Sequence, residues 1–238
     1  MDWKDHHRLV PHTSNAFVLA LDGPAASGKS TVGLAAAQQL GFMYLDTGLL
    51  YRALTWLALR HECDLTDAEA VSALAEATEL SVRPASVDDG RQVDVLANGE
   101  DVSNELKRPE VDGNVSKVSA YPRVRQVLRA AQRDAIASPG TILAGRDIGT
   151  VVVPEADLKV WMTASAEERA RRRSDQTGEP FESVLAAMVA RDKQDSTRAT
   201  APMVAAEDAV LVDTTGYEES EVVERLVALV RERQGVRA

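Results

Sequence analysis

The chain has 238 residues, of which 45% are hydrophobic, and its formal net charge at pH 7 is −10. This length can bury the core of one or two domains, and the acidic balance argues against a general binder of nucleic acid or of anionic membranes. The single cysteine, Cys63, excludes an intrachain disulfide and a cysteine-rich metal site, and fits a reducing cytoplasm. No stretch is long and apolar enough to predict a transmembrane helix.

The first 15 residues are polar and contain three of the four histidines, His6, His7 and His12. They lack the apolar segment of a secretory signal. A metal-binding tail is one interpretation of these histidines. Terminal segments are rarely ordered unless they are tied down, so we expect a flexible N-terminal extension.

A phosphate-binding motif follows this segment. Ala16–Leu21 is an unbroken apolar run that predicts a buried parallel strand, and residues 23–31 then match the pattern G-x-x-x-x-G-K-[ST]. In such a loop the backbone N–H groups surround phosphate oxygens. Lys29 would reach the terminal phosphates, and Ser30 would offer its hydroxyl to Mg²⁺. Val32–Leu40 predicts the helix whose N-terminus faces the same anion.

The next elements continue the alternation of strands and helices. Phe42–Leu45 predicts a short strand, and Leu49–His61 predicts a helix. Arg52 lies in the first turn of that helix, where the helix dipole disfavours a cation. It is therefore a candidate ligand for an anion, although a solvated arginine fits the position equally well. Asp67–Leu80 predicts another helix, with Thr66 or Asp67 as its cap.

A different pattern interrupts the alternation. Leu80–Pro84 and Gln92–Ala97 read as β-segments, and Asn98-Gly99 predicts a hairpin turn after the second of them. Glu105–Ser119 predicts a helix with a break near Pro109. We expect these segments to form a small antiparallel insert within an otherwise α/β chain.

The alternation then returns. Pro122 opens a helix that is expected to run to about Ala137. Three of its arginines share one face, which most simply is a solvated basic face: Arg125, Arg129 and Arg133. Thr141–Gly145 predicts a strand, and Arg146–Thr150 follows at its carboxyl end, which is the edge where ligands bind in open α/β sheets.

Arginine-rich helices mark the last third of the chain. After a predicted strand at Leu158–Met162, helices are expected at Ser165–Ser174 and Phe181–Arg198. Two such helices joined by a Gly/Pro turn suit a flap that closes over phosphates, and an amphipathic surface hairpin is the alternative. A strand at Ala209–Val212 and a helix at Glu218–Arg233 complete the predicted elements.

The residue inventory narrows the chemistry. A phosphate loop alone permits an ATPase, a GTPase, a kinase or an inert nucleotide binder, but the guanine-reading pattern N-K-x-D is absent. A kinase needs a second anion site, which Arg52, Arg125 and Arg146 can supply. His61 is the only histidine beyond the tail, so candidate bases are scarce. A phosphate acceptor is mostly ionised at pH 7 and needs no base, and it therefore fits better than a hydroxyl acceptor.

Five separated stretches together resemble the bacterial cytidylate kinases, which are P-loop nucleoside monophosphate kinases. They are Leu21-Asp22-Gly23-Pro24, Leu45-Asp46-Thr47-Gly48 with Tyr51-Arg52, Tyr121-Pro122-Arg123-Val124-Arg125, Gly145-Arg146-Asp147-Ile148-Gly149-Thr150, and Arg191-Asp192 with Asp195 and Arg198. The resemblance extends from about Phe17 to the last helix. It implies transfer of the γ-phosphoryl group of ATP to CMP or dCMP with Mg²⁺.

The resemblance also implies an architecture. The expected fold is α/β, with a P-loop NTPase core built on a mostly parallel sheet flanked by helices, a small α+β monophosphate-binding insert and a helical lid. In this chain the expected divisions are the extension 1–15, core 16–64, insert 65–120, core 121–164, lid 165–200 and core 201–238.

Site residues are implied by position in the matching motifs. The ATP site is expected at Gly23, Pro24, Ala25, Ala26, Ser27, Gly28, Lys29, Ser30, Thr31 and Arg169, with Ser30 as the Mg²⁺ ligand. The acceptor phosphate is expected at Arg52, Arg146 and Arg198, near Thr47. Ser116, Arg125 and Asp147 are the expected cytosine readers, and Arg191 and Asp195 the expected contacts to sugar or phosphate. The expected catalytic residues are Lys29, Arg146 and Arg198.

The assignment of cytosine has a physical basis. Cytosine offers an amino donor and two acceptors, so Asp147 can accept from it while Arg125 donates to it. Uracil carries a carbonyl in place of that amino group and would face the carboxylate unfavourably. A structural salt bridge is the alternative role for Asp147. The chain departs from the family at Ala144, where an acid is expected, and this weakens any indirect metal contact from that position.

Three interpretations follow from the sequence. The first is a CMP/dCMP kinase that acts as a cytoplasmic monomer on small-molecule nucleotides, without nucleic acid or membrane partners. The second is a related kinase for UMP, AMP or a small hydroxyl acceptor. The third is a nucleotide-binding regulator without turnover, against which Lys29 and the full set of arginines argue.

Overall fold

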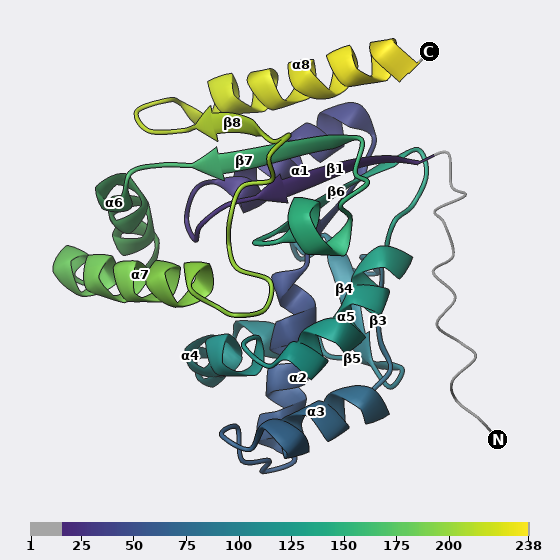
Figure 1. The fold of residues 1–238 in the computed structure, drawn as a ribbon, viewed down its shortest axis with the longest axis vertical. Coiled ribbons are helices and arrows are strands. Elements are labelled where there is room, and N and C mark those ends of the chain that lie inside the picture. Colours follow the sequence, from purple (N-terminus) through teal and green to yellow (C-terminus); the bar gives the residue numbers. More distant parts are fainter. Residues whose placement is uncertain (1–15, 238) are drawn as a thin grey trace.

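A parallel sheet forms the centre of the molecule. The computed structural model describes residues 16–237; the expected extension at 1–15 lies outside the described residues. Five strands pair in parallel in the order β2-β6-β1-β7-β8 (Figure 1). The strands are β1 (Phe17–Asp22), β2 (Met43–Asp46), β6 (Gly140–Gly145), β7 (Leu158–Thr163) and β8 (Val210–Asp213). The predicted α/β class with a mostly parallel sheet is confirmed.

Helices cover both faces of this sheet (Figure 1). Every residue of β1 is buried, and successive side chains point to opposite faces. The covering helices are α1 (Lys29–Leu40), α2 (Gly48–Arg60), α5 (Pro122–Asp134) and α8 (Glu219–Arg237). Leu19 and Leu21 pack in the cluster that includes residues of α1 and α8, whereas Ala20 packs in the cluster that includes Leu54 of α2. Burial on both sides explains the unbroken apolar run of β1.

The insert is a separate antiparallel unit, seen at the lower end of Figure 1. Its sheet has the order β3-β4-β5, and the turn at Asn98 and Gly99 has positive φ at both residues, 51° and 82°. Such a turn matches the twist of the strands it joins, so the predicted hairpin is confirmed. The insert comprises α3 (Ala68–Ala77), β3 (Leu80–Pro84), β4 (Val93–Ala97), β5 (Glu100–Asp101), a 3₁₀ turn at Glu105–Lys107 and α4 (Pro109–Val118).

Two helices, α6 (Ala166–Thr177) and α7 (Phe181–Ser196), project from the core and are called the lid here (Figure 1). Gly178, with φ of 72°, ends α6 in the left-handed conformation. The lid has its own small apolar cluster, Ala170, Val184 and Met188, against which Ala25 and Ala26 of the phosphate loop pack. The loop and the lid therefore share a contact.

The element boundaries differ from the predictions at several ends. The first helix begins at Lys29, three residues before its expected start, because Gly28 in the left-handed conformation caps it. The helix predicted at Asp67–Leu80 ends at Ala77, where the chain turns into β3, and Asp67 caps it through hydrogen bonds from Glu69 and Ala70. α5 stops at Asp134 and α6 continues to Thr177.

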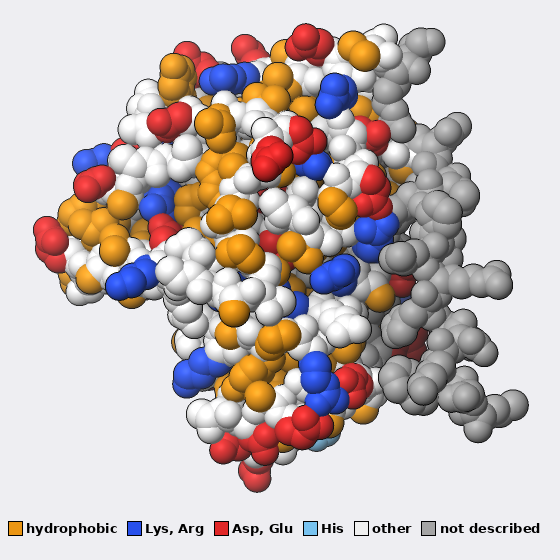
Figure 2. All heavy atoms as spheres, viewed as in Figure 1, with side chains coloured by type: hydrophobic (Ala, Val, Ile, Leu, Met, Phe, Trp, Pro, Cys, Tyr) orange, Lys and Arg blue, Asp and Glu red, His pale blue; other side chains and the backbone are white. Residues whose placement is uncertain are grey.

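Charge on the surface follows the composition. On the face shown in Figure 2, basic side chains are scattered among acidic ones, and acidic side chains gather at the lower end, where Figure 1 labels α3. Of the helices between residues 16 and 237, none combines the length and the apolar character that crossing a bilayer requires.

Candidate active site

The phosphate loop joins the carboxyl end of β1 to the start of α1. Gly23 has φ of 146°, and a Cβ atom there would stand 1.9 Å from the backbone oxygen of Met162. Only glycine fits such a close approach to β7. Gly28, with φ of 93°, leads directly into α1. The two glycines of the motif therefore allow the tight backbone turns of the phosphate loop. The loop lies at the edge of the sheet where ligands bind.

Lys29 is folded back onto its own loop. Its Nζ donates to the backbone oxygens of Gly23 at 2.8 Å and Pro24 at 2.6 Å. The side chain is buried, and this burial, with the charge of Arg146 as a second cause, lowers the pKa of Lys29 well below its usual value. A desolvated ammonium held by neutral carbonyls gains strongly from an incoming anion.

Oxygen atoms suited to a metal ion lie beside this lysine. Ser30 is exposed, and its Oγ is 3.4 Å from Oδ2 of Asp46 at the end of β2. The other oxygen of Asp46 accepts the Gly48 N–H. Hydroxyl and carboxylate oxygens are the ligands that Mg²⁺ prefers. No group of three acidic, histidine or cysteine ligands occurs within residues 16–237, so a bound Mg²⁺ would need ligands from nucleotide phosphates as well.

Ala144 lies within the core. Its side chain is buried in the apolar cluster that includes Phe17 and Ala36, so this position presents no group to a metal ion. The acid that the structure brings to Ser30 is Asp46 instead. The sequence motifs predict no role for Asp46. Its position directly after a predicted strand, at the ligand-binding edge of the sheet, is the feature that could have indicated one.

The expected acceptor-phosphate arginines are paired with carboxylates. Arg52 donates to Oδ1 of Asp112 at 2.5 Å and to the backbone oxygen of Leu106. Arg146 donates to Oδ2 of Asp195 at 3.2 Å and to the backbone oxygen of Gly23 at 2.7 Å. Arg146 thus connects the phosphate loop to the lid.

A second pair of arginines lies on and just after α7. Arg198 is nearly buried and pairs with Asp195, 3.7 Å from Nη2 to Oδ1. Within residues 16–237, the buried Nε of Arg191 has no hydrogen-bond partner. Burial, with the charge of Arg146 as a second cause, lowers the pKa of Arg191. Crowded, partly desolvated guanidinium groups of this kind favour an anionic ligand.

Two of the three expected cytosine readers meet directly. Arg125 and Asp147 form an ion pair of 2.6 Å from Nη2 to Oδ2, with side chains only 6% and 7% exposed. Arg125 also donates to the backbone oxygen of Ser119 and lies over the ring of Tyr51. Ser116, half-buried, is one turn before Ser119. Arg125 is therefore not part of a solvated basic face, because α5 turns this residue inward.

Thr47, whose hydroxyl is expected near the monophosphate, uses that hydroxyl to hold the backbone in this structure. Its Oγ1 donates to the backbone oxygen of Ala144 at 2.9 Å, and its backbone N–H donates to the same atom. The hydroxyl therefore links the ends of β2 and β6. A Cβ atom on Gly145 would stand 2.9 Å from this hydroxyl, which explains the small residue there.

The lid contacts the phosphate loop and the insert. Arg169 pairs with Asp192 at 2.7 Å and donates to the backbone oxygen of Ala25. On the other side, Arg173 lies 3.5 Å from Asp112, which also pairs with Arg52. The lid arginines therefore face the same space as the expected ATP and acceptor residues.

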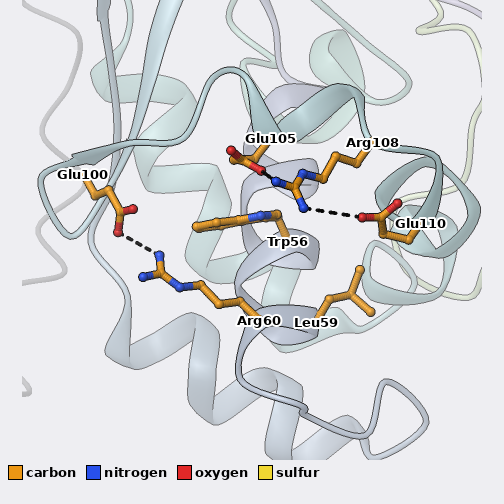
Figure 3. A pocket seen from close by; sticks show the side chains of 7 residues that line it. All are labelled: Trp56, Leu59, Arg60, Glu100, Glu105, Arg108 and Glu110. Carbon is orange, nitrogen blue, oxygen red and sulfur yellow. Dashed lines mark hydrogen bonds and ion pairs between the residues drawn. The ribbon is translucent and has the colours of Figure 1, made fainter.

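A cavity of about 430 Å³ lies away from all of these residues. In it, the indole of Trp56 stands between Arg60 and Arg108 (Figure 3). Arg60 pairs with Glu100 at 2.8 Å, and Arg108 pairs with two further glutamates of the lining. Each charged side chain of the lining thus has an ionic partner within it, and none of the expected site residues lines the cavity.

Comparison with known proteins finds one family along most of the chain. A family model described as cytidylate kinase matches residues 19–232. A cytidylate kinase of Carboxydothermus hydrogenoformans is 44% identical over 223 residues, which cover 92% of this chain and 99% of that protein. A cytidylate kinase of Mycolicibacterium paratuberculosis is 46% identical over 231 residues, with 94% and 99% covered.

Proposed function

We propose, from the premise that this chain belongs to the cytidylate kinase family, that it transfers the γ-phosphoryl group of Mg-ATP to CMP or dCMP and releases ADP with CDP or dCDP. Membership makes the chain a nucleoside monophosphate kinase, a phosphotransferase, and CMP the expected acceptor. The metal, the use of dCMP and the roles of individual residues are the parts that we add.

One observation carries the assignment of the catalytic centre. Nζ of Lys29 and Nη1 of Arg146 donate to the same atom, the backbone oxygen of Gly23, at 2.8 and 2.7 Å. Lys29 belongs to the phosphate loop and Arg146 to the acceptor side. In the transition state, negative charge is spread over the oxygens of the phosphoryl group that passes from donor to acceptor. Cations that converge on this position stabilise that charge.

On the donor side, the N–H groups of residues 23–31 and Lys29 hold the ATP phosphates in this proposal, and Arg169 adds a positive charge from the lid. Ser30 and Asp46 offer oxygen ligands to Mg²⁺, which neutralises phosphate charge when bound. Because the hydrogen-bond partners of Lys29, two carbonyl oxygens and the Ser27 hydroxyl, are all neutral, it can turn to the phosphates without breaking an ion pair.

On the acceptor side, Arg52, Arg146 and Arg198 bind the CMP phosphate. This phosphate is mostly ionised at neutral pH and attacks without a general base. The residues' task is to orient two anions and to offset their repulsion. Asp112 and Asp195 now occupy these guanidinium groups, so CMP must compete with them.

The pair of Arg125 and Asp147 reads the base. With CMP bound, Asp147 accepts from the amino group and Arg125 donates to the cytosine acceptors, so each buried charge keeps a partner. In the same proposal Ser116 also contacts the base, and Arg191 and Asp195 contact the sugar or phosphate. Thr47 orders the strand ends around the monophosphate through Ala144.

The direct test is turnover with defined acceptors. Purified protein with Mg-ATP is given CMP, dCMP, UMP or AMP, and the ADP formed is measured. We expect ADP with CMP and dCMP and little with UMP or AMP. Strong turnover of UMP or AMP would favour the related kinase, and ATP binding without ADP from any acceptor would favour the non-catalytic regulator.

The proposal includes a cytoplasmic monomer. Each face of the sheet has its own apolar cover within the chain, and the lone thiol Cys63 requires no oxidising compartment. Light scattering on the purified protein measures the mass directly. A mass near 25.7 kDa supports the monomer, and twice that value contradicts it.

A further inference from the structure

A buried carboxylate joins the two halves of the site. Asp22, the last residue of β1, is 5% exposed. Its Oδ1 accepts the Ile148 N–H at 2.8 Å, and its Oδ2 accepts the Gly149 N–H at 2.7 Å. Both oxygens are therefore engaged by successive backbone donors from the segment after β6.

The neighbours of these three residues are the proposed reaction machinery. Gly23 follows Asp22 and receives both Lys29 and Arg146 on its backbone oxygen. Asp147 directly precedes Ile148. Gly149 packs closely against the same carboxylate: a Cβ atom there would stand 3.4 Å from Oδ2 of Asp22 and 3.1 Å from the Lys159 side chain.

We infer that Asp22 is a positioning residue, which sets the segment carrying Arg146 and Asp147 at a fixed distance from the phosphate loop so that acceptor and donor meet in line. The inference rests on the proposed function. Asp22 contacts neither substrate; it acts through the backbone that it holds. A misplacement of reacting groups by about 1 Å can cost roughly 100-fold in rate.

The chemistry of the contact requires a carboxylate. Two backbone donors need two acceptor oxygens, and an asparagine has one acceptor and one NH₂ group that would face an N–H. The charged groups that face Asp22 are Asp147 and Lys29, and the amine of the adjacent Lys159 is held by Asp208. Burial, opposed by the two hydrogen bonds, raises the pKa of Asp22 to about 6.

The decisive variant is Asp22→Asn, studied by steady-state kinetics with its thermal melting recorded. We expect kcat to fall about 10- to 100-fold and KM for CMP to rise, while KM for ATP stays within about twofold. The ratio of variant to wild-type kcat is measured from pH 5 to 8, because titration of the CMP phosphate cancels in this ratio. It should rise towards one as the pH falls below about 6, where the wild-type carboxyl is also protonated.

Asp157, which directly precedes β7, provides a matched control because its carboxylate also binds β1. Oδ2 of Asp157 accepts the Val18 N–H at 2.7 Å near the other end of β1. Asp157→Asn should change the melting temperature without altering kcat, KM for CMP or the pH dependence. Equal kinetic losses in both variants would reduce Asp22 to a structural role and overturn the inference.

If Asp22→Asn does not fold, a second variant tests the positioning role of Asp22. Asp22→Glu keeps both acceptor oxygens and both N–H donors but lengthens the side chain by one methylene, which displaces the segment from β1, and we expect the same lowering of kcat with KM for ATP unchanged. Wild-type kinetics in either folded variant would overturn the inference. Failure of the proposed function is distinct, because the wild-type protein itself would then form no ADP with CMP.

Discussion

The two anion-binding regions of this molecule hold their cations in opposite ways. On the donor side, Lys29 is bound by the carbonyl oxygens of Gly23 and Pro24, which carry no net charge. On the acceptor side, Arg52 and Arg125 are bound by the carboxylates of Asp112 and Asp147. The Lys29 ammonium on the donor side therefore has no carboxylate partner, whereas Arg52 and Arg125 on the acceptor side are held in ion pairs.

This difference determines what a ligand must displace when it enters each region. A phosphate entering the donor loop replaces neutral partners and gains the full interaction with Lys29, whose ammonium is costly to keep buried. A phosphate or base entering the acceptor side must replace or share a carboxylate. Affinity for ATP should therefore depend most on Lys29, whereas the acceptor side is tuned by its acids.

The largest effect is expected from Lys29→Met, which removes the only full charge that the loop supplies. We expect kcat to fall by about 10²- to 10³-fold, as for other single groups that stabilise transition-state charge. Because its lowered pKa means that the buried ammonium opposes folding at pH 7, the melting temperature should not fall.

ADP formation at saturating ATP and CMP measures this effect, with calorimetry alongside. Lys117→Met is the control, because Lys117 is exposed on α4 and its amine donates a hydrogen bond to the side chain of Asn114 on the same helix. A loss of less than tenfold in Lys29→Met would contradict the contrast between the two regions.

Asp147→Asn should have the next largest effect, on the choice of base. The asparagine can donate to the uracil carbonyl where the carboxylate accepts from the cytosine amino group, so kcat/KM for CMP should fall relative to that for UMP by about 10- to 100-fold. Arg125 loses its buried partner, so stability should fall as well.

Competition assays with mixed CMP and UMP give the ratio directly. The control is Asp134→Asn at the exposed end of α5, which should leave the ratio unchanged. An unaltered CMP to UMP ratio in Asp147→Asn would assign Asp147 to the structural salt bridge instead.

A smaller effect of opposite sign is expected from Asp112→Asn. Burial opposes ionisation of Asp112, but its hydrogen bond with Arg52 and the positive charge of Arg52 outweigh burial and lower its pKa, so the acid is charged at pH 7 and competes with the acceptor phosphate. Removing this competitor should lower KM for CMP by about two- to fivefold, the range of a partly exposed ion pair.

Initial rates at varied CMP measure KM, and Glu110→Gln, in the same turn of α4 but paired with Arg108, is the matched control. A higher KM in Asp112→Asn would mean that Asp112 orients Arg52 for the phosphate rather than competing with it.

The smallest effect on catalysis is expected outside both regions. Asp94 is fully buried in the insert between Arg83 and Arg91. Hydrogen bonds from Ser86, assisted by Arg83 and opposed by burial, lower its pKa to about 2. Because the folded pKa is below the usual 3.8, the carboxylate stabilises the protein above about pH 4, and this contribution is lost as the pH falls to about 2.

Melting temperatures of wild type and Asp94→Asn test this between pH 7 and 2. The variant should be less stable at pH 7, with unchanged kinetics, and the difference should vanish at the acid end. The exposed Asp88, replaced by Asn, is the control. A difference that persists at pH 2 would show that the amide itself disrupts the insert.

Much of the fold could be predicted from local sequence patterns. The strand, loop and helix around Lys29, the hairpin at Asn98-Gly99 and the return to alternation after Pro122 were readable because each depends on residues close in the chain. Helix ends were predicted less well. α3 stops before Leu80 because that residue pairs with Ala97 in β3-β4, a contact that no local pattern contains.

The sequence alone determined the phosphate loop, the family and the positions whose side chains are the candidate ligands, because these are recorded in short motifs. Which of these groups come into contact depends on the three-dimensional fold. Arg52 reaches Asp112 across 60 residues and Arg146 reaches Gly23 across 123, and Asp22 holds Gly149 from another strand. Strand order and the seating of the lid set such contacts, and both arise from the burial of apolar faces contributed by the whole chain.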